Sequence, residues 1–163
     1  MIDSKLTFSD IYKMSTYEIS KRFLYLGEGI SRKVFAINDK YVIKIAKGME
    51  GLYQNKVELY VFKHCGEKYK KYLCPIIWHK PDMLVMPRAV PLKSIDSSLK
   101  KVNLKNIRNE EEAYSDIMRL TRNFLLLKDD IESASSWGKI DGTAILIDYG
   151  CTSEEGDEFY NDL

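Results

Sequence analysis

Short apolar runs separated by turn residues mark the first third of the chain as β-structure. Phe23–Leu26, Lys33–Ile37 and Tyr41–Ala46 have the length and the β-branched or aromatic content of strands. The first turn, Gly27–Arg32, contains two glycines, and the second is the tight turn Asn38–Lys40. These residues predict an antiparallel β-meander with a glycine-bearing first turn.

Apolar residues at helical spacing lie on both sides of this meander. We expect helix within residues 3–20, with Ser4 as its N-cap. A second helix is expected over residues 52–72, after a break in the chain at Gly48–Gly51. The resulting order is helix, three strands, helix.

Prolines mark the middle of the chain. Two further strands, Cys74–Trp78 and Met83–Met86, lead into residues 87–92, an extended connector that contains two prolines. Residues 93–108 are polar and basic with little periodicity. We expect them to form a linker with about one helical turn.

The last third returns to helical spacing and then to β-structure. Asn109 followed by Glu112 is a capping-box pattern, and it opens a helix that is expected to run to Leu127. Residues 128–138 read as an acidic loop of small residues. A hairpin over residues 139–147, turning at an Asp-Gly pair, follows.

The stretch of most chemical interest ends this hairpin. Four apolar residues, Ala144–Ile147, are followed directly by Asp148, Tyr149 and Gly150. A carboxylate at the end of a buried strand needs a cation or hydrogen bonds to hold it, and Mg²⁺ is bound by such carboxylates together with phosphate oxygens. An ordinary strand-turn has the same pattern, so the upstream residues decide between the two. The acidic tail that follows is expected to be mobile.

Composition narrows the class of protein. The 163 residues are 45% hydrophobic and 30% charged, which is typical of a globular protein and not of a disordered one. A formal net charge of +1 gives no electrostatic case for nucleic acid or an anionic membrane. No apolar run approaches the length of a membrane span, and the start lacks the regions of a signal peptide. We therefore expect a cytoplasmic protein.

The cysteines allow two interpretations. Cys65, Cys74 and Cys151 are odd in number and show no metal-ligand spacing. Together with His64 and His79 they leave a zinc site as the alternative, but buried reduced thiols are favoured.

Three features of the first half also have two interpretations each. The glycine turn is either a plain hairpin turn or a flap whose backbone N–H groups approach phosphate oxygens. Lys44 shares a strand face with Val42 and Ala46, and either faces solvent from an edge strand or lies beneath the glycine turn. Glu58 is either a solvated flank of its helix or points inward at Lys44.

Taken in order, these elements resemble the protein kinase-like fold in a minimal, truncated form. The resemblance spans residues 22–150 and implies an α+β fold class. It implies a helical extension at residues 1–21, an antiparallel β-sheet N-lobe with one main helix at residues 22–90, and a reduced helical C-lobe at residues 91–163.

The resemblance implies a site for ATP and Mg²⁺. In that family a Gly-rich loop covers the phosphates, a strand lysine pairs with a helix glutamate, and an Asp before an aromatic residue and Gly holds Mg²⁺. Arg32 stands in place of the loop's third glycine, and adenine is expected to meet the backbone near Met86 and Arg88. The nucleotide-binding residues implied are Gly27, Glu28, Gly29, Val34, Lys44, Glu58, Met86 and Arg88.

Catalytic residues and metal ligands follow from the same resemblance. Asp130 and Lys44 are implied as catalytic residues, with Asp130 at the family's usual separation from Asp148. Asp148 and Ser135 are implied as metal ligands, Ser135 standing where the family has Asn. Lys128–Asp129 replaces the family's His-Arg pair, and no Ala-Pro-Glu follows.

Two functions remain open on these residues. One is an ATP- and Mg²⁺-dependent phosphotransferase acting on a protein or on a small-molecule hydroxyl, including the aminoglycoside type of kinase. The other is a catalytically degenerate pseudokinase, of phage or mobile-element origin, that binds or inhibits a host-defence protein. The missing His-Arg and Asn favour the second, and the retained Lys44, Glu58, Asp130 and Asp148 favour the first.

Overall fold

The computed structural model describes residues 6–163 and divides into two compact units. Unit 1 comprises the chain up to Lys56 together with Pro75–Arg88, and unit 2 comprises Val57–Cys74 and Ala89–Leu163. Ser4, the expected N-cap, lies outside the described residues, and the lobe boundaries expected from the resemblance stay predictions. Within residues 6–163 no helix has the length and apolar character needed to span a bilayer.

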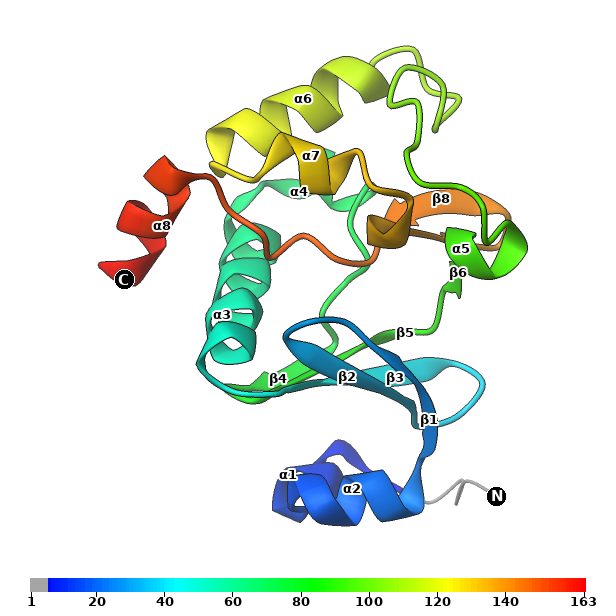
Figure 1. Cartoon of the computed structure of the whole chain (residues 1–163), viewed down its shortest axis with the longest axis vertical. Coiled ribbons are helices and arrows are strands. Elements are labelled where there is room, and N and C mark those ends of the chain that lie inside the picture. The colour runs from blue at the N-terminus through cyan, green and yellow to red at the C-terminus, as the bar shows by residue number, and fades with distance from the viewer. Residues whose placement is uncertain (1–5) are drawn as a thin grey trace. The chain divides into compact units, whose positions relative to one another are not determined.

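Unit 1 is built on an antiparallel sheet (Figure 1). The strand order is β1-β2-β3-β5-β4, so β3 is the central strand, and the predicted antiparallel sheet is confirmed. The elements are α1 (Phe8–Lys13), α2 (Thr16–Arg22), β1 (Leu24–Glu28), β2 (Arg32–Ala36), β3 (Tyr41–Ala46), the start of α3 (Met49–His64), β4 (Trp78–Lys80) and β5 (Met83–Pro87).

Alternation along β3 gives the sheet two different faces. Ile43 and Ile45 share one hydrophobic core with Ile11 of α1 and Ile19 of α2, so these two helices cover that face. Successive side chains of a strand point to opposite faces. Lys44 therefore lies on the face away from α1 and α2.

Helix α3 contains a glycine that was expected to break the chain. The helix starts at Met49 and includes Gly51, where a Cβ atom would lie 2.7 Å from the Cα atom of Ala46. Glycine here permits a close approach of the helix to the end of β3. The helix ends at His64, well short of residue 72, because the chain turns at Gly66 with a φ of 84°.

Unit 2 contains the rest of α3 and a three-stranded sheet of order β6-β7-β8. The predicted hairpin is confirmed, and its turn residues Asp141 and Gly142 both have positive φ, as a type I′ turn requires. The remaining elements are α4 (Glu67–Lys70), β6 (Val90–Pro91), α5 (Leu92–Ile95), α6 (Ala113–Asn123), α7 (Lys128–Ile131), a 3₁₀ turn (Ala134–Ser136), β7 (Trp137–Ile140), β8 (Thr143–Leu146) and α8 (Glu154–Asn161).

The predicted limits of α6 were wrong at both ends. The helix begins at Ala113 without a side-chain cap, so the capping box is not formed. Glu112 instead accepts a hydrogen bond from Lys71 at 3.1 Å. The helix ends at Asn123, shortly before Leu125 takes a left-handed conformation with a φ of 54°.

Segments expected to be irregular are more regular than the sequence suggested. Residues 128–138 contain α7 and the 3₁₀ turn, and the buried indole of Trp137 donates from Nε1 to the carbonyl of Ile131 at 2.8 Å. The tail expected to be mobile is the helix α8, in which Tyr160 is fully buried. Conversely, the strand expected from residue 74 begins only at Trp78.

Candidate functional site

Four residues form a row across the sheet of unit 1. Gly27 pairs with Val34, Val34 with Lys44, and Lys44 with Leu84 on successive neighbouring strands. Directly paired residues of antiparallel strands point to the same face, which here is the face away from α1 and α2. Three of the four, Gly27, Val34 and Lys44, are residues that the sequence predicted for nucleotide binding.

Lys44 is buried in this row, with 6% of its surface exposed. Its strand is central in the sheet, so the alternative of a solvent-facing lysine on an edge strand is wrong. A buried ammonium group is costly unless charges or hydrogen bonds compensate it. The burial of Lys44 therefore favours a specific role over a solvated one.

The glycine turn is tied to the end of β3 by a lysine that the sequence analysis did not single out. Lys47 forms an ion pair with Glu28, and its Nζ donates to the carbonyl of Gly29 at 3.1 Å. The hydroxyl of Tyr25 donates to Glu28 Oε1 at 2.9 Å. The bond from Lys47, together with that from Tyr25, holds the pKa of Glu28 below its usual value. The N–H of Gly29 donates to the carbonyl of Arg32 at 3.0 Å, so this amide serves the turn itself.

Arg32, which replaces the expected third glycine, connects strand and helix. Its side chain is buried, and Nη1 donates to Asn55 Oδ1 at 3.2 Å. Asn55 in turn donates from Nδ2 to the carbonyl of Pro81 at 3.2 Å. Arg32 thus links β2 to α3, a contact that glycine cannot make.

The segment expected to meet adenine lies at the end of β5. Met86 pairs with Val42 of β3, and the N–H of Arg88 donates to the carbonyl of Lys40 at 2.7 Å. The Arg88 amide therefore already has a backbone partner. An adenine at this place would need a different backbone group, and the assignment of Met86 and Arg88 stays a prediction.

In unit 2 a buried serine joins the two aspartates assigned from the sequence. Ser136 Oγ donates to the main-chain carbonyl of Asp130 at 2.7 Å and lies 3.5 Å from its carboxylate Oδ2. The carbonyl of Ser136 accepts the N–H of Ile147 at 2.8 Å and that of Asp148 at 3.4 Å. One residue therefore fixes both the segment that carries Asp130 and the strand end that carries Asp148.

Ser135, assigned as a metal ligand, has different surroundings. Its side chain is exposed, and its Oγ shares a hydrogen bond with Ser133 Oγ at 2.8 Å. Ser136 is 1% exposed. Three serines lie among residues 133–136, and their spacing from Asp130 does not show which of them is buried. The role of Ser135 as a ligand stays a prediction.

Glu58 is fully buried and bonds to the aromatic residue of the Asp-Tyr-Gly triplet. Its Oε1 accepts the main-chain N–H of Tyr149 at 3.1 Å, so the alternative of a solvated flank is wrong. Tyr149 is also fully buried, and its hydroxyl donates to the carbonyl of Cys74 at 2.8 Å. Both the main-chain N–H and the side-chain hydroxyl of Tyr149 are therefore hydrogen-bonded, which fixes the triplet in place.

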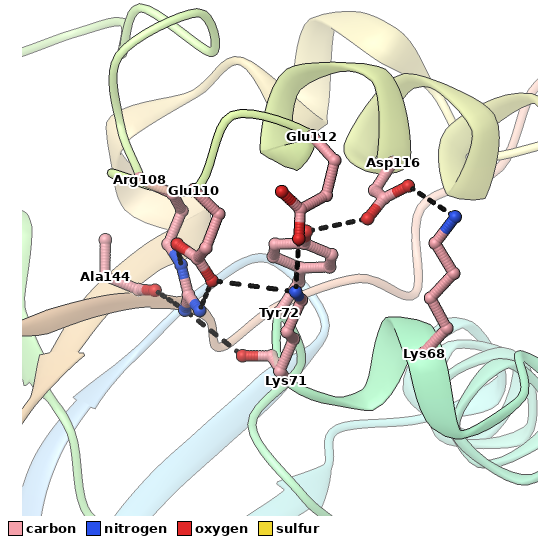
Figure 2. A network of polar contacts seen from close by, with 8 residues as sticks. All are labelled: Lys68, Lys71, Tyr72, Arg108, Glu110, Glu112, Asp116 and Ala144. Atoms are coloured by element: carbon pink, nitrogen blue, oxygen red, sulfur yellow. Dashed lines mark hydrogen bonds and ion pairs between the residues drawn. The ribbon is translucent and has the colours of Figure 1, made fainter.

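A polar network supports the start of strand β8 (Figure 2). Arg108 Nη1 donates to the carbonyls of Ala144 at 2.7 Å and Lys71 at 3.1 Å, and Nη2 pairs with Glu110 at 2.6 Å. The Arg108 side chain is 7% exposed and lies 5.1 Å above the ring of Tyr72. The bond from Arg108 lowers the pKa of Glu110 to about 2.

The same network contains a buried carboxylate on α6. Asp116 accepts a hydrogen bond from the Tyr72 hydroxyl at 2.8 Å and pairs with Lys68 at 3.2 Å. Burial alone raises the pKa of Asp116, but the bonds from Tyr72 and Lys68 outweigh it and the net pKa is lowered. The carbonyl of Tyr72 accepts the N–H of Leu146, two residues before Asp148, so the network extends along β8.

Within residues 6–163 no three His, Cys, Asp or Glu side chains are grouped closely enough to hold a metal by themselves, so the zinc alternative has no cluster there. Cys65 and Cys74 are buried and form no disulfide, as expected. A hard cation needs only one or two protein carboxylates when phosphate oxygens and water complete its shell. Asp148 carries a carboxylate of this kind, and its role as a Mg²⁺ ligand stays a prediction.

Comparisons with known proteins give little beyond this geometry. No protein-family model matches the chain, and no curated protein matches it. Among solved structures, the streptomycin–ATP–APH(2")-IIa ternary complex is similar over 92% of this chain and 72% of that chain, with 13% identity and a TM-score of 0.45. A similarity of this size does not assign a fold family or an activity.

Proposed function

We propose that the chain is a kinase-like phosphotransferase that uses ATP and Mg²⁺ to phosphorylate a hydroxyl group. One observation carries the proposal: Ser136 bonds both to Asp130 and to the main chain at Asp148. Phosphoryl transfer depends on positioning and charge neutralisation more than on covalent chemistry of the protein. A buried residue that fixes two carboxylate-bearing segments supplies positioning of this kind.

Four side chains have distinct roles in this proposal. Asp130 accepts the proton of the acceptor hydroxyl. Asp148 holds Mg²⁺, which when bound neutralises charge on the phosphate oxygens. Lys44 binds the α- and β-phosphates beneath the glycine turn, and Glu58 orients Lys44. The pairing of Lys44 with Glu58 is itself a prediction, because each residue belongs to a different unit.

Nucleotide binding is tested by thermal denaturation of the full chain with Mg²⁺ and ATP. A ligand at a hundredfold excess over its Kd stabilises the folded state by about 2.7 kcal/mol. ATP with a chelator and Mg²⁺ alone are the controls. Stabilisation by the combination supports the proposal. Its absence counts against a nucleotide site and leaves the protein-binding module to be tested instead.

The acceptor class is tested by transfer of labelled phosphate from ATP. The acceptors are a generic unfolded protein, an aminoglycoside and the chain itself. Labelling of the small molecule alone assigns a small-molecule kinase, whereas labelling of protein assigns a protein kinase. Labelling of none, despite ATP binding, removes the phosphotransferase proposal.

A further inference from the structure

Helix α3 has contacts on two nearly opposite sides. Glu58 and Tyr60 are two residues apart, so at 100° per residue their side chains point about 200° apart around the axis. Glu58 bonds to the N–H of Tyr149 on one side. The ring of Tyr60 meets the ring of Tyr160 of α8 on the other, with centroids 5.5 Å apart. Figure 1 shows α8 beside this helix.

Tyr160 of α8 is held by burial and by a hydrogen bond. Its side chain is fully buried, and its hydroxyl donates to the carbonyl of Phe124 at 2.9 Å. Phe159 and Phe124 also contact Tyr60, at centroid distances of 5.6 and 6.2 Å, in edge-to-face arrangements. Such edge-to-face aromatic pairs stabilise a contact beyond the area they bury. The end of the chain is therefore packed against α3 through a defined cluster.

The connection from Gly150 to α8 is short and bonded along its length. The carbonyl of Cys151 accepts the N–H of Leu127 at 3.0 Å, and the N–H of Ser153 donates to the carbonyl of Leu125 at 2.9 Å. Ser153 is also the N-cap of α8, because its Oγ accepts the N–H of Gly156 at 3.2 Å. The two contact sides of α3 are thus joined by a fixed stretch of chain.

We propose that residues 148–161 form a clamp around the second half of α3, and that Tyr160 is a positioning residue. Through Tyr60 it keeps α3 seated so that Glu58 remains bonded to the Tyr149 amide. A 14-residue stretch of chain therefore couples three features: the helix that carries Glu58, the segment before Asp130, and Asp148. The clamp follows from the contacts alone, whereas its consequence for catalysis rests on the proposed function.

Amide hydrogen exchange tests the clamp without any assumption about activity. The full chain is labelled with ¹⁵N-tyrosine, and the Tyr149 signal is identified by its loss in Tyr149→Phe. The Tyr72 amide, which donates to the carbonyl of Tyr69 at 3.1 Å in the same unit, is the internal reference. Tyr160→Ala is expected to speed exchange at Tyr149 by about tenfold relative to Tyr72, because it opens the clamp locally.

Matched variants separate positioning from general destabilisation. Tyr160→Phe keeps the ring against Tyr60 and is expected to leave the ratio of exchange rates near that of the wild type. Leu163→Ala, at an exposed position, is expected to change nothing. Should Tyr160→Ala fail to fold, Tyr160→Leu is measured with the same expected direction. Equal acceleration at Tyr149 and Tyr72, or no change at either, would overturn the clamp.

The rate of phosphate transfer tests the consequence of the clamp for catalysis. Tyr160→Ala is expected to lower kcat for phosphate transfer about tenfold or more with little change in KM for ATP, and Tyr160→Phe to restore it. A wild-type chain without Mg²⁺-dependent ATP stabilisation would defeat the proposed function, while the exchange ratio would still decide on the clamp. Normal turnover in Tyr160→Ala, with ATP bound, would refute the positioning role.

Discussion

The carboxylate of Glu58 accepts the main-chain N–H of Tyr149 at 3.1 Å, across 91 residues of sequence. Both residues are fully buried. The bond joins Glu58 to the Asp-Tyr-Gly triplet, whereas the partner expected for Glu58 from the sequence is Lys44. A charge at this depth is tolerated only where hydrogen bonds compensate it, and the Tyr149 amide supplies one of them.

Substitution of Glu58 is expected to show how much of this arrangement depends on the bond. Glu58→Ala leaves the buried Tyr149 N–H without its acceptor and is expected to lower the free energy of unfolding by about 1–3 kcal/mol from that loss, with a further loss from the cavity. Glu58→Gln keeps an acceptor oxygen and is expected to cost less. Urea denaturation of both variants measures the difference. Equal destabilisation by the two would mean that the charge, and not the bond to Tyr149, matters for stability.

The two neighbouring serines provide an internal control for the bridge to Asp130. Ser136→Ala removes a buried hydroxyl that donates to Asp130 and is expected to cost about 1 kcal/mol and to reduce phosphate transfer. Ser135→Ala changes an exposed side chain and is expected to stay within about 0.5 kcal/mol of the wild type. If transfer depends on Ser135 and not on Ser136, the assignment from sequence spacing holds and the bridge is only structural.

Lys47 is expected to affect nucleotide affinity through Glu28. A carboxylate beside a phosphate-binding turn repels the phosphates unless a cation neutralises it. Lys47→Met leaves Glu28 without its ion pair and is expected to weaken ATP binding several-fold, more at low salt than at high salt. Glu28→Gln in the Lys47→Met background is expected to restore most of the affinity. Titration calorimetry of the wild type and the two variants measures the affinity for ATP. Failure of Glu28→Gln to restore binding in the Lys47→Met background would contradict this role of Lys47.

Acid stability is expected to depend on the Arg108 network. Because Glu110 has a folded-state pKa of about 2, below the ordinary value of 4.5, its contribution is present above about pH 4.5 and is lost as the pH falls towards 2. Between about pH 4.5 and 2, Glu110→Gln is expected to lose about 1 kcal/mol less of its free energy of unfolding than the wild type loses. This figure allows for the partial exposure of the Glu110 side chain. Glu111→Gln, at an exposed neighbouring position, is the control. Parallel pH profiles for Glu110→Gln and the wild type would remove Glu110 from this role.

Much of unit 1 was predictable because its signals are local. Alternation in Tyr41–Ala46 and the turn residues around it set the strands and their faces, and the burial of Ile43 and Ile45 followed that pattern. The role of Gly51 was misread, because a glycine needed for close packing looks the same in sequence as a glycine that breaks a helix. Packing distance is a tertiary property that a local pattern does not contain.

The candidate site was predictable in its residue types and less so in its contacts. The burial of Glu58 and its bond to Tyr149 were not contained in the spacing that selected Glu58, and nothing in the sequence marked Ser136 as the serine that bonds to Asp130. The helix α8 was missed altogether, because an acidic segment is stabilised here by Tyr160 against residues far away in sequence. Its one local signal was Ser153 ahead of an acidic first turn, which is a typical helix start.

The central claim is most directly tested by phosphate transfer in Asp148→Asn. This change keeps the shape of the side chain and removes the charge that the proposed Mg²⁺ site requires. The measurement compares transfer of labelled phosphate from ATP by the wild type and by Asp148→Asn, at equal concentration and with folding checked by circular dichroism. We expect transfer by the wild type and a loss of about a hundredfold or more in the variant. Equal rates in the two proteins, or no transfer by either, would contradict this claim.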